Sequence, residues 1–520
     1  MTKPESLVVI LCLVSALLIF FRIGEASLAN WDEAIYAQVA RETVTENSWL
    51  TLQYNGQDWF HKPPLYMWMT SVSQLILGET ETAARSASAL AGVFLAVVTF
   101  FWVRKMRNEK VALLAVVVLL TTRHIIFASR FGTTDVLLTL CIYGALLFYL
   151  YTASNPKYWY LVSTFAGLAI MTKGAAGLVL PIILFIFLIY DKRLVETIRE
   201  RHFWIALIPA AILVIPWHVY QYVKSGQDFL REYVGYHVID RSQSALEGND
   251  GGIFFYIHVV RRYFSPWVFL FAASGIYAAR ELRNKKTNIH YPIIAIATVG
   301  LLYTVIQTKL MWYILPIYPA LAFIVADMVY RAYKKTRSLA YILVIAAPAL
   351  VLIFDYTFAS FVALLIVYGV ATIVYSMRKD VAIHRYLVIA VAVFFFMGAA
   401  GEISTLYSNK VSPAATISRD ATCDPSEPEP LMVITDLKDL AKPVAFYYSN
   451  CEVHQVKSAD KLANVSRKND AVKILAAQDQ LPALKALQPL EILSENDEYI
   501  YAEFLETIKP AAKKNEPDVK

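Results

Sequence analysis

The chain has 520 residues, of which 57% are hydrophobic and 17% charged, and its mean hydropathy is +0.47. This composition excludes a soluble globule and predicts a polytopic α-helical membrane protein. The formal net charge of +6 is modest for this length, and we expect no nucleic-acid partner.

Apolar runs long enough to span a bilayer recur along the chain and predict about thirteen transmembrane helices. They lie at 6–23, 85–103, 111–128, 133–152, 158–172, 174–190, 203–222, 264–279, 291–306, 310–330, 338–354, 358–377 and 386–401. The shorter apolar run at 64–77 is interrupted by polar residues, which favours a position in the membrane interface. The first run lacks a small-residue cleavage pattern before Glu25, so we expect a retained helix rather than a signal peptide.

Basic residues fall in alternate connections between these runs. One set of loops is rich in Lys and Arg, for example around Lys105, Arg199, Lys285 and Lys335, whereas the opposite set carries few. The positive-inside rule therefore predicts a cytoplasmic N-terminus. It places the segment 24–84, the loop 223–263 and everything after 402 on the non-cytoplasmic side.

The stretch Asn30–Ala37 contains two adjacent carboxylates, Asp32 and Glu33, between aromatic residues and directly after the first apolar run. Such a pair at a membrane surface suits proton transfer or metal chemistry. The alternative is that Asp32 caps the short amphipathic helix that begins here. The residues of this stretch alone leave both interpretations open.

Four basic residues stand at outer ends of helices, where the rule expects few: Lys62, Arg130, Lys173 and Lys309. Each one could extend its charge from an apolar stem into the interface. Four cations on the same face as a carboxylate pair point instead to a site for an anionic group, most simply a phosphate. Lys supplies a compact charge for such a group, and Arg supplies a bidentate fork.

The outer loop 223–263 is too long for an ordinary connection and alternates charged with aromatic residues. An unstructured polar loop is the simple alternative. We expect a partly helical flap over the site, with Gly248–Gly252 as its turn.

After residue 401 the composition changes, which divides the chain into a transmembrane domain at 1–401, a small soluble α/β domain at 402–508 and a disordered tail at 509–520. Within 402–508 we expect strands at 431–435, 445–448 and 499–504 and helices at 457–467 and 477–488. Cys423 and Cys451 both lie there, in a compartment that permits disulfides, so we expect them to pair. No Gly-rich nucleotide motif occurs, which favours a lipid-linked over a nucleotide-linked donor.

Several separated motifs resemble one family. These are the runs Trp31–Glu42 and Tyr54–Leu65, then Asp135, Thr172–Gly174, and Lys309 with Tyr313–Ala320. In this order they are similar to the bacterial lipid A 4-amino-4-deoxy-L-arabinose transferases, within the protein O-mannosyltransferase-like superfamily. The resemblance covers roughly residues 1–330 and implies a GT-C type membrane glycosyltransferase of the bacterial inner membrane with its active site on the periplasmic face.

Such an enzyme moves a sugar, a hexose or a pentose, from a polyprenyl (undecaprenyl) phosphate donor to a lipid A-like lipid, a glycan or a protein, and we expect inversion at the anomeric carbon. The resemblance implies that Asp32, with Glu33 beside it, is the catalytic carboxylate, supported by Asp135 and Lys173. It assigns the donor phosphate to Lys62 and Arg241. Arg130, Lys309 and Tyr313 complete the set expected to contact the phosphate.

The chain also departs from the family pattern. The residue before Lys62 is His61, where the aminoarabinose transferases commonly have Glu, and Ile35 stands where Arg is often found. His61 and His237 could hold a divalent metal ion, either Zn or Mg/Mn, since His can replace a carboxylate as a ligand. The alternative is that both are simply hydrogen-bonded, with no cofactor.

A polytopic lipid or sugar transporter or flippase without transferase chemistry is the main competing function. Transporters place charges near the bilayer midplane on broken helices and often repeat one half of the fold. Here the charged residues gather at one membrane face and the sequence shows no internal repeat. This distribution favours the transferase.

Overall fold

The computed structural model describes residues 3–29, 31–264, 267–283, 288–336, 412–421, 431–434, 442–449, 453–456, 472–487 and 489–504. The chain forms two compact units. The first contains 1–23, 60–69 and 85–408, and the second contains 24–59, 70–84 and 409–520. The helices expected at 338–354, 358–377, 386–401 and 457–467, the pair Cys423 and Cys451, and the expected tail at 509–520 lie outside the described residues.

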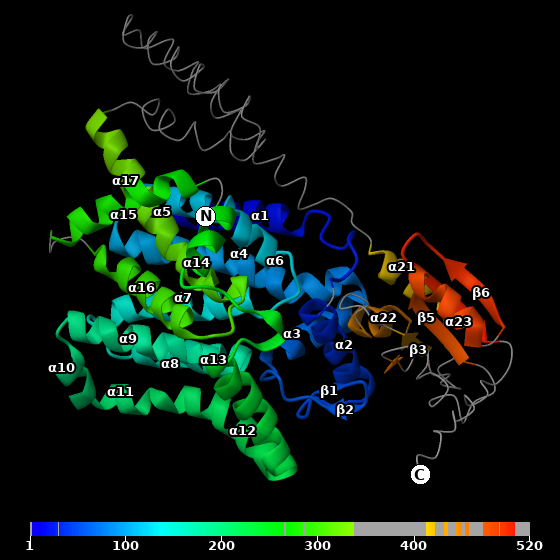
Figure 1. The fold of residues 1–520 in the computed structure, drawn as a ribbon. Coiled ribbons are helices and arrows are strands. Elements are labelled where there is room, and N and C mark those ends of the chain that lie inside the picture. The colour runs from blue at the N-terminus through cyan, green and yellow to red at the C-terminus, as the bar shows by residue number, and fades with distance from the viewer. Residues whose placement is uncertain are drawn as a thin grey trace, which may run out of the picture. The chain divides into compact units, whose positions relative to one another are not determined.

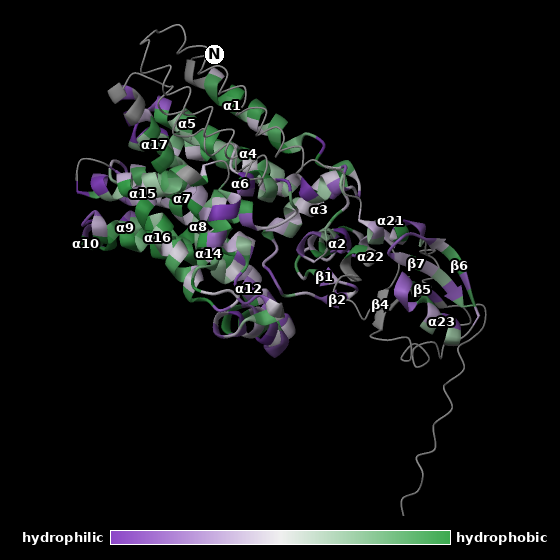
Figure 2. Ribbon diagram, turned by 45° about the horizontal axis from the view of Figure 1, so that its top comes forward, coloured by the Kyte–Doolittle hydropathy of each residue, from purple (hydrophilic) through white to green (hydrophobic). Residues whose placement is uncertain are grey.

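The first unit is helical, and its helices are mostly hydrophobic (Figure 2). Its elements are α1 (Lys3–Phe20), α4 (Glu81–Met106), α5 (Glu109–Leu120), α6 (Arg123–Ser129), α7 (Asp135–Thr152), α8 (Tyr158–Lys173), η1 (Gly174–Leu178), α9 (Val179–Tyr190), α10 (Leu194–Arg199), α11 (Arg201–Ile205), α12 (Leu207–Phe229), η2 (Leu230–Asp240), α13 (Arg241–Gln243), η3 (Leu246–Gly248), α14 (Phe255–Tyr263), α15 (Val268–Leu282), α16 (His290–Val305), η4 (Met311–Ile317) and α17 (Tyr318–Thr336). Helix α3 (Leu65–Leu77) passes from the first unit into the second.

Within the described residues, five helical stretches are long and apolar enough to cross a membrane, or six if the bent pair α5 and α6 forms one span. The run 111–128, expected to be one helix, is broken between α5 and α6 by a bend of 68°. The run 310–330 begins as the 3₁₀-helix η4, which contains Pro316, and continues as α17. The apolar run at 64–77, expected in the membrane interface, contains α3, whose 13 residues are too short to span.

Two polar networks tie helix ends together at one end of the first unit. The Asp191 carboxylate accepts hydrogen bonds from the hydroxyls of Tyr149 (2.7 Å) and Tyr291 (2.9 Å). The ring of Tyr149 contacts both Trp159, at the start of α8, and Phe187, at the end of α9. Helices α8 and α9, which lie side by side in Figure 1, therefore run antiparallel. The corner between them is η1.

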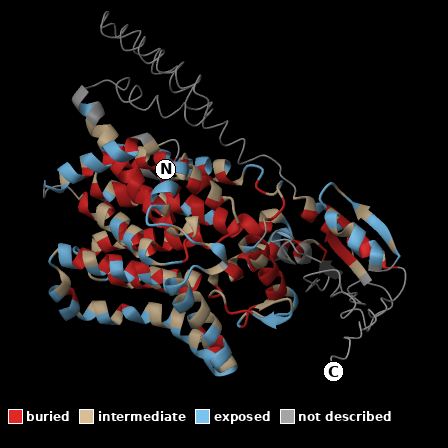
Figure 3. Cartoon of the chain, in the orientation of Figure 1, coloured by how far each residue is buried: buried red, intermediate tan, exposed pale blue. Residues whose placement is uncertain are grey.

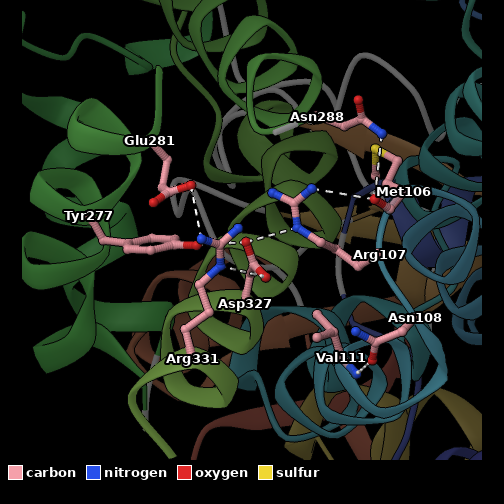
Figure 4. Close-up of polar contacts among 9 residues, drawn as sticks. All are labelled: Met106, Arg107, Asn108, Val111, Tyr277, Glu281, Asn288, Asp327 and Arg331. Atoms are coloured by element: carbon pink, nitrogen blue, oxygen red, sulfur yellow. Dashed lines mark hydrogen bonds and ion pairs between the residues drawn. The ribbon is translucent and has the colours of Figure 1, made fainter. Parts of the chain in front are cut away.

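The second network centres on the buried carboxylate of Asp327 in α17. It accepts from Arg107 (3.0 Å) and from the hydroxyl of Tyr277 (2.7 Å), and Arg331 lies 3.6 Å away (Figure 4). Glu281 pairs with Arg331 at 3.1 Å. These residues join the ends of α4, α15 and α17 that the charge pattern predicts to be cytoplasmic.

The second unit contains α2 (Asp32–Thr45), the hairpin β1 (Gln53–Tyr54) and β2 (Gln57–Asp58), and a five-stranded mixed sheet in the order β4-β3-β5-β7-β6. The sheet strands are β3 (Leu431–Ile434), β4 (Val453–Val456), β5 (Val472–Ala477), β6 (Leu490–Glu495) and β7 (Tyr499–Phe504), and its helices are α21 (Pro413–Asp420), α22 (Lys442–Ser449) and α23 (Leu481–Leu487), the last preceded by the turn η6 (Gln478–Gln480). Strands β4, β3 and β5 are parallel, and β7 is antiparallel to both neighbours. Buried residues gather on β5, β7 and α2 (Figure 3).

Three expected elements of this unit are found: the strands at 431–435 and 499–504 are β3 and β7, and the helix at 477–488 contains α23. The expected strand at 445–448 is wrong, because these residues lie in α22. Val444 and Tyr447 are buried three residues apart on one helical face, and a short apolar run does not by itself distinguish a strand from such a helix.

Candidate active site

A buried ion pair joins the start of α7 to the end of α8, next to the corner η1. The Lys173 ammonium lies 2.5 Å from the Asp135 carboxylate, and the two side chains are only 10% and 5% exposed. Asp135 is the first residue of α7 and Lys173 the last of α8, which packs against α7. Helix α8 ends here because Gly174 has φ 57° and ψ −127°, a conformation that favours glycine.

Arg241 and Tyr313 complete this corner. The Arg241 guanidinium donates to the Tyr313 hydroxyl at 3.3 Å, and the Lys173 ammonium lies 5.1 Å from the centre of the Tyr313 ring. The segment around Arg241 is fixed by backbone hydrogen bonds from Gln307 to Ser242 and from Thr308 to Arg241. Two cations thus lie next to one tyrosine, and only one of them is paired with a carboxylate, which leaves a net positive charge at the corner.

Tyr256 of α14 contributes a further phenol near Tyr313. Burial, together with the neighbouring phenols of Tyr313 and Tyr303, raises the pKa of Tyr256, so its hydroxyl stays protonated. A neutral hydroxyl near Tyr313 can donate to an anion without opposing its charge.

A second group lies where the segment after Phe60 meets η2. The His61 Nε2 atom is 2.8 Å from the Glu232 carboxylate, and the rings of His61 and His237 are 4.5 Å apart. The Lys62 ammonium donates to the His61 carbonyl at 3.0 Å, and Lys62 and Arg241 lie close enough to act electrostatically on His237. Since η2 carries Glu232 and His237 and ends next to Arg241, it connects the two groups.

The donor set of this second group only partly fits a metal. Both ring nitrogens of His237 are buried without a hydrogen-bond partner among the described residues, as ligating nitrogens would be. However, His61 is already paired with Glu232, and the described part of the chain contains no group of three His, Cys, Asp or Glu side chains placed to hold an ion. No step of the chemistry below is therefore assigned to a metal.

Two cations expected at the phosphate are occupied elsewhere. Arg130 donates to the carbonyls of Ile19 (2.6 Å) and Phe21 (2.7 Å), which end α1. The buried Lys309 ammonium donates to the carbonyls of Thr304 (3.0 Å) and Ile306 (2.6 Å), which end α16. Carbonyls at a helix C-terminus lack partners within the helix and attract cations, so both residues act as helix caps.

Asp32 and Glu33 belong to the second unit. The N-cap of α2 is Trp31, and Asp32 is the first residue of the helix. The Asp32 side chain is half-buried and has no hydrogen-bond or ion-pair partner among the described residues. The capping alternative for Asp32 is therefore wrong. Glu33 is instead 1% exposed and accepts from the backbone amide of Ala29 at 2.7 Å, so its carboxylate fixes the start of the helix.

The C-terminal sheet and α2 share one hydrophobic core, which includes Ala34 and Ala37 of α2 and Leu475 and Tyr501 of the sheet. Arg41 of α2 pairs with Glu79 at 2.7 Å and donates to the Tyr447 carbonyl at 2.9 Å. The sheet thus supports the helix on which Asp32 stands.

Sequence reasoning missed three residues around the corner: Glu232, His218 and Tyr233. Glu232 pairs with His61, and His218 and Tyr233 bond to each other. His218 lies inside an apolar helix, where a lone polar residue signals a buried partner, but the sequence does not show which partner.

Comparisons with known proteins show what the chain is similar to. The family model of dolichyl-phosphate-mannose-protein mannosyltransferases matches residues 61–220. An uncharacterized protein of Aquifex aeolicus (strain VF5) is 29% identical over 69% of this chain and 71% of its own length. The undecaprenyl phosphate-alpha-4-amino-4-deoxy-L-arabinose arabinosyl transferase of Shewanella sediminis (strain HAW-EB3) is 26% identical over 64% of this chain, and the match spans 61% of that protein's length.

Among solved structures, ArnT from Cupriavidus metallidurans bound to undecaprenyl phosphate superimposes with a TM-score of 0.74 at 18% identity, covering 96% of this chain and 98% of that one. The archaeal oligosaccharyltransferase AglB from Archaeoglobus fulgidus gives 0.55 at 11% identity, covering 92% and 70%. The chain has the fold of the GT-C membrane glycosyltransferases. The resemblance drawn from the motifs is confirmed.

Proposed function

We propose that the chain is an inverting glycosyltransferase that takes a sugar from a polyprenyl phosphate carrier at the periplasmic face of a bacterial inner membrane. The observation that carries this proposal is the meeting of Lys173, Arg241 and Tyr313, from three separate segments, around one positively charged corner. Such a corner suits a phosphate, because the cations can pair with its charge and the hydroxyl can donate to its oxygens. Relatives named as transferases of an undecaprenyl phosphate-linked sugar support it over a transporter.

In this mechanism the phosphate of the donor is the leaving group. Charge develops on its oxygens as the bond to the anomeric carbon breaks, and cations already in place stabilise that charge without reorganisation. Lys173 and Arg241 supply the cations, and Lys62 supplies a third from the neighbouring group. Asp135 holds the Lys173 ammonium by one of its three N–H bonds, so the other two remain for the phosphate.

A carboxylate activates the acceptor in this mechanism. We assign Asp32 as the general base toward an acceptor hydroxyl, or as an orienting group if the acceptor is a phosphate that needs no deprotonation. Its lack of a partner among the described residues leaves its carboxylate available for this role. Attack opposite the leaving phosphate inverts the anomeric configuration.

The proposal includes about thirteen membrane spans, a cytoplasmic N-terminus and a C-terminal domain on the periplasmic side. The acceptor is a lipid A-like lipid, a glycan or a protein, and the transferred sugar is a pentose or a hexose. His61 and His237 are the residues to examine for a metal, by measuring the metal content of the purified protein.

Mass spectrometry of lipids and envelope glycans tests the proposal. Cells without the protein should lack one sugar substituent and accumulate its polyprenyl phosphate donor. A Lys173→Ala variant expressed in these cells should not restore the sugar substituent. If cells that express the protein and cells that lack it contain the same lipids and glycans, the assignment is contradicted.

A further inference from the structure

A cluster of aromatic and apolar side chains lies directly behind the Lys173 corner. It contains Phe60, Met171, Trp217 and Phe229, with Tyr233 packed against them. Phe60 precedes His61, Met171 lies two residues before Lys173, and Tyr233 stands in η2 before His237. One cluster therefore contacts all three segments that carry the site.

A polar pair, formed by His218 and Tyr233, packs against this cluster. The His218 Nδ1 atom is 2.8 Å from the Val214 carbonyl, and its Nε2 atom is 3.0 Å from the Tyr233 hydroxyl. Because a carbonyl only accepts, Nδ1 must carry the proton, and in the neutral ring Nε2 is then an acceptor. The Tyr233 hydroxyl accordingly donates to His218, which fixes its direction.

The same hydroxyl lies against Gly174. A Cβ atom added at Gly174 would lie 2.7 Å from the Tyr233 oxygen, so any side chain there would collide with it. The Tyr233 ring is also stacked on Phe229, with 12° between the planes and 5.1 Å between the centres. The phenol is thus held by its ring and by its hydroxyl, and its tip abuts the residue that follows Lys173.

We propose that His218 and Tyr233 are positioning residues that set the place of the Lys173 ammonium, and of Arg241 at the end of the same η2 segment, for binding the donor phosphate. This inference rests on the proposed function. Packing alone would require only the ring of Tyr233. The hydroxyl and its histidine partner are explained by the need to keep η2 pressed against the Gly174 corner while both cations face one anion.

Binding of undecaprenyl phosphate to the full-length protein in detergent, followed by native mass spectrometry, tests the proposal. Tyr233→Phe removes one hydroxyl and keeps the ring, so the dissociation constant should rise about 3- to 10-fold, the effect of one lost hydrogen bond. His218→Phe should have the same effect, and the double variant should be no worse than either single one, because both remove the same bond. His218→Gln, which keeps an acceptor oxygen, should recover part of the affinity.

Tyr149→Phe is the matched control. It removes another partly buried hydroxyl, bonded to Asp191 at 2.7 Å in the network at the opposite end of the unit, and should lower thermal stability without changing the dissociation constant. If wild type binds and Lys173→Ala weakens binding while Tyr233→Phe does not, the positioning role is wrong and the proposed function stands. Equal losses in Tyr233→Phe and Tyr149→Phe, or additive losses in the double variant, would also overturn it. If wild type does not bind undecaprenyl phosphate, the proposed function and this inference both fail.

Discussion

Replacing the Lys173–Asp135 pair by apolar residues separates its structural role from its chemical one. Lys173→Met leaves the Asp135 carboxylate, only 5% exposed, without its partner. Removing one member of a buried pair typically costs about 3–5 kcal/mol, because the remaining charge stays desolvated. The double variant Lys173→Met/Asp135→Leu removes both charges, and apolar replacement of a whole pair is often neutral, so its stability should return to within about 1 kcal/mol of wild type.

Donor binding should not return with stability. Lys173 is assigned to the phosphate, so both the single and the double variant should bind undecaprenyl phosphate at least about 10-fold more weakly than wild type, as expected for losing a charge-assisted hydrogen bond. Apparent melting temperatures from intrinsic fluorescence in detergent report the first effect, and native mass spectrometry reports the second. A single variant that melts like wild type would refute the buried pair, and a double variant that binds normally would refute the phosphate role.

Three further predictions concern other parts of the chain. Arg130→Met should lower the melting temperature, because α1 loses the donors at its last carbonyls, yet leave undecaprenyl phosphate affinity unchanged; the opposite pattern would return Arg130 to the phosphate site. Cys423 and Cys451 should resist thiol labelling until the protein is reduced, and labelling of both in the unreduced protein would argue against a disulfide. The disulfide would close the loop between the two residues and should stabilise the protein by roughly 3–4 kcal/mol in the chain-entropy model. A reporter fused after Lys110 should be cytoplasmic and one after Gly248 periplasmic, and a reversal would invalidate the assigned orientation.

The resemblance assigns Asp135 and Lys173 to one site as supporting residues, and the structure shows that they pair. One begins an apolar helix and the other ends the next, so two short-connected antiparallel helices bring them to the same end. The helical character of the loop 223–263 is likewise visible in its composition and length. These inferences depend on local pattern and connectivity, which a single sequence contains.

The uses of Arg130 and Lys309 could not be predicted in the same way. A cation at an outer helix end looks the same in sequence whether it faces a phosphate or caps a neighbouring helix, and the choice depends on which carbonyls the fold brings near. Glu232 was missed for a similar reason, since its partner His61 is distant in the chain. The helix at 442–449 shows the remaining limit: burial of Val444 and Tyr447 against other elements outweighs the strand preference of the run.

Sugar transfer by the purified protein in detergent tests the central claim most directly, because without a membrane a transporter has no compartments between which to move a substrate. Polyprenyl phosphate sugars and acceptor lipids extracted from the same cells are incubated with the protein, and the released polyprenyl phosphate is measured by mass spectrometry. Wild type should release it, and a well-folded Asp32→Asn variant should do so at least about 10²-fold more slowly, as expected for loss of a general base. No release by wild type would contradict the transferase assignment, and full activity of Asp32→Asn would remove Asp32 from the catalytic role.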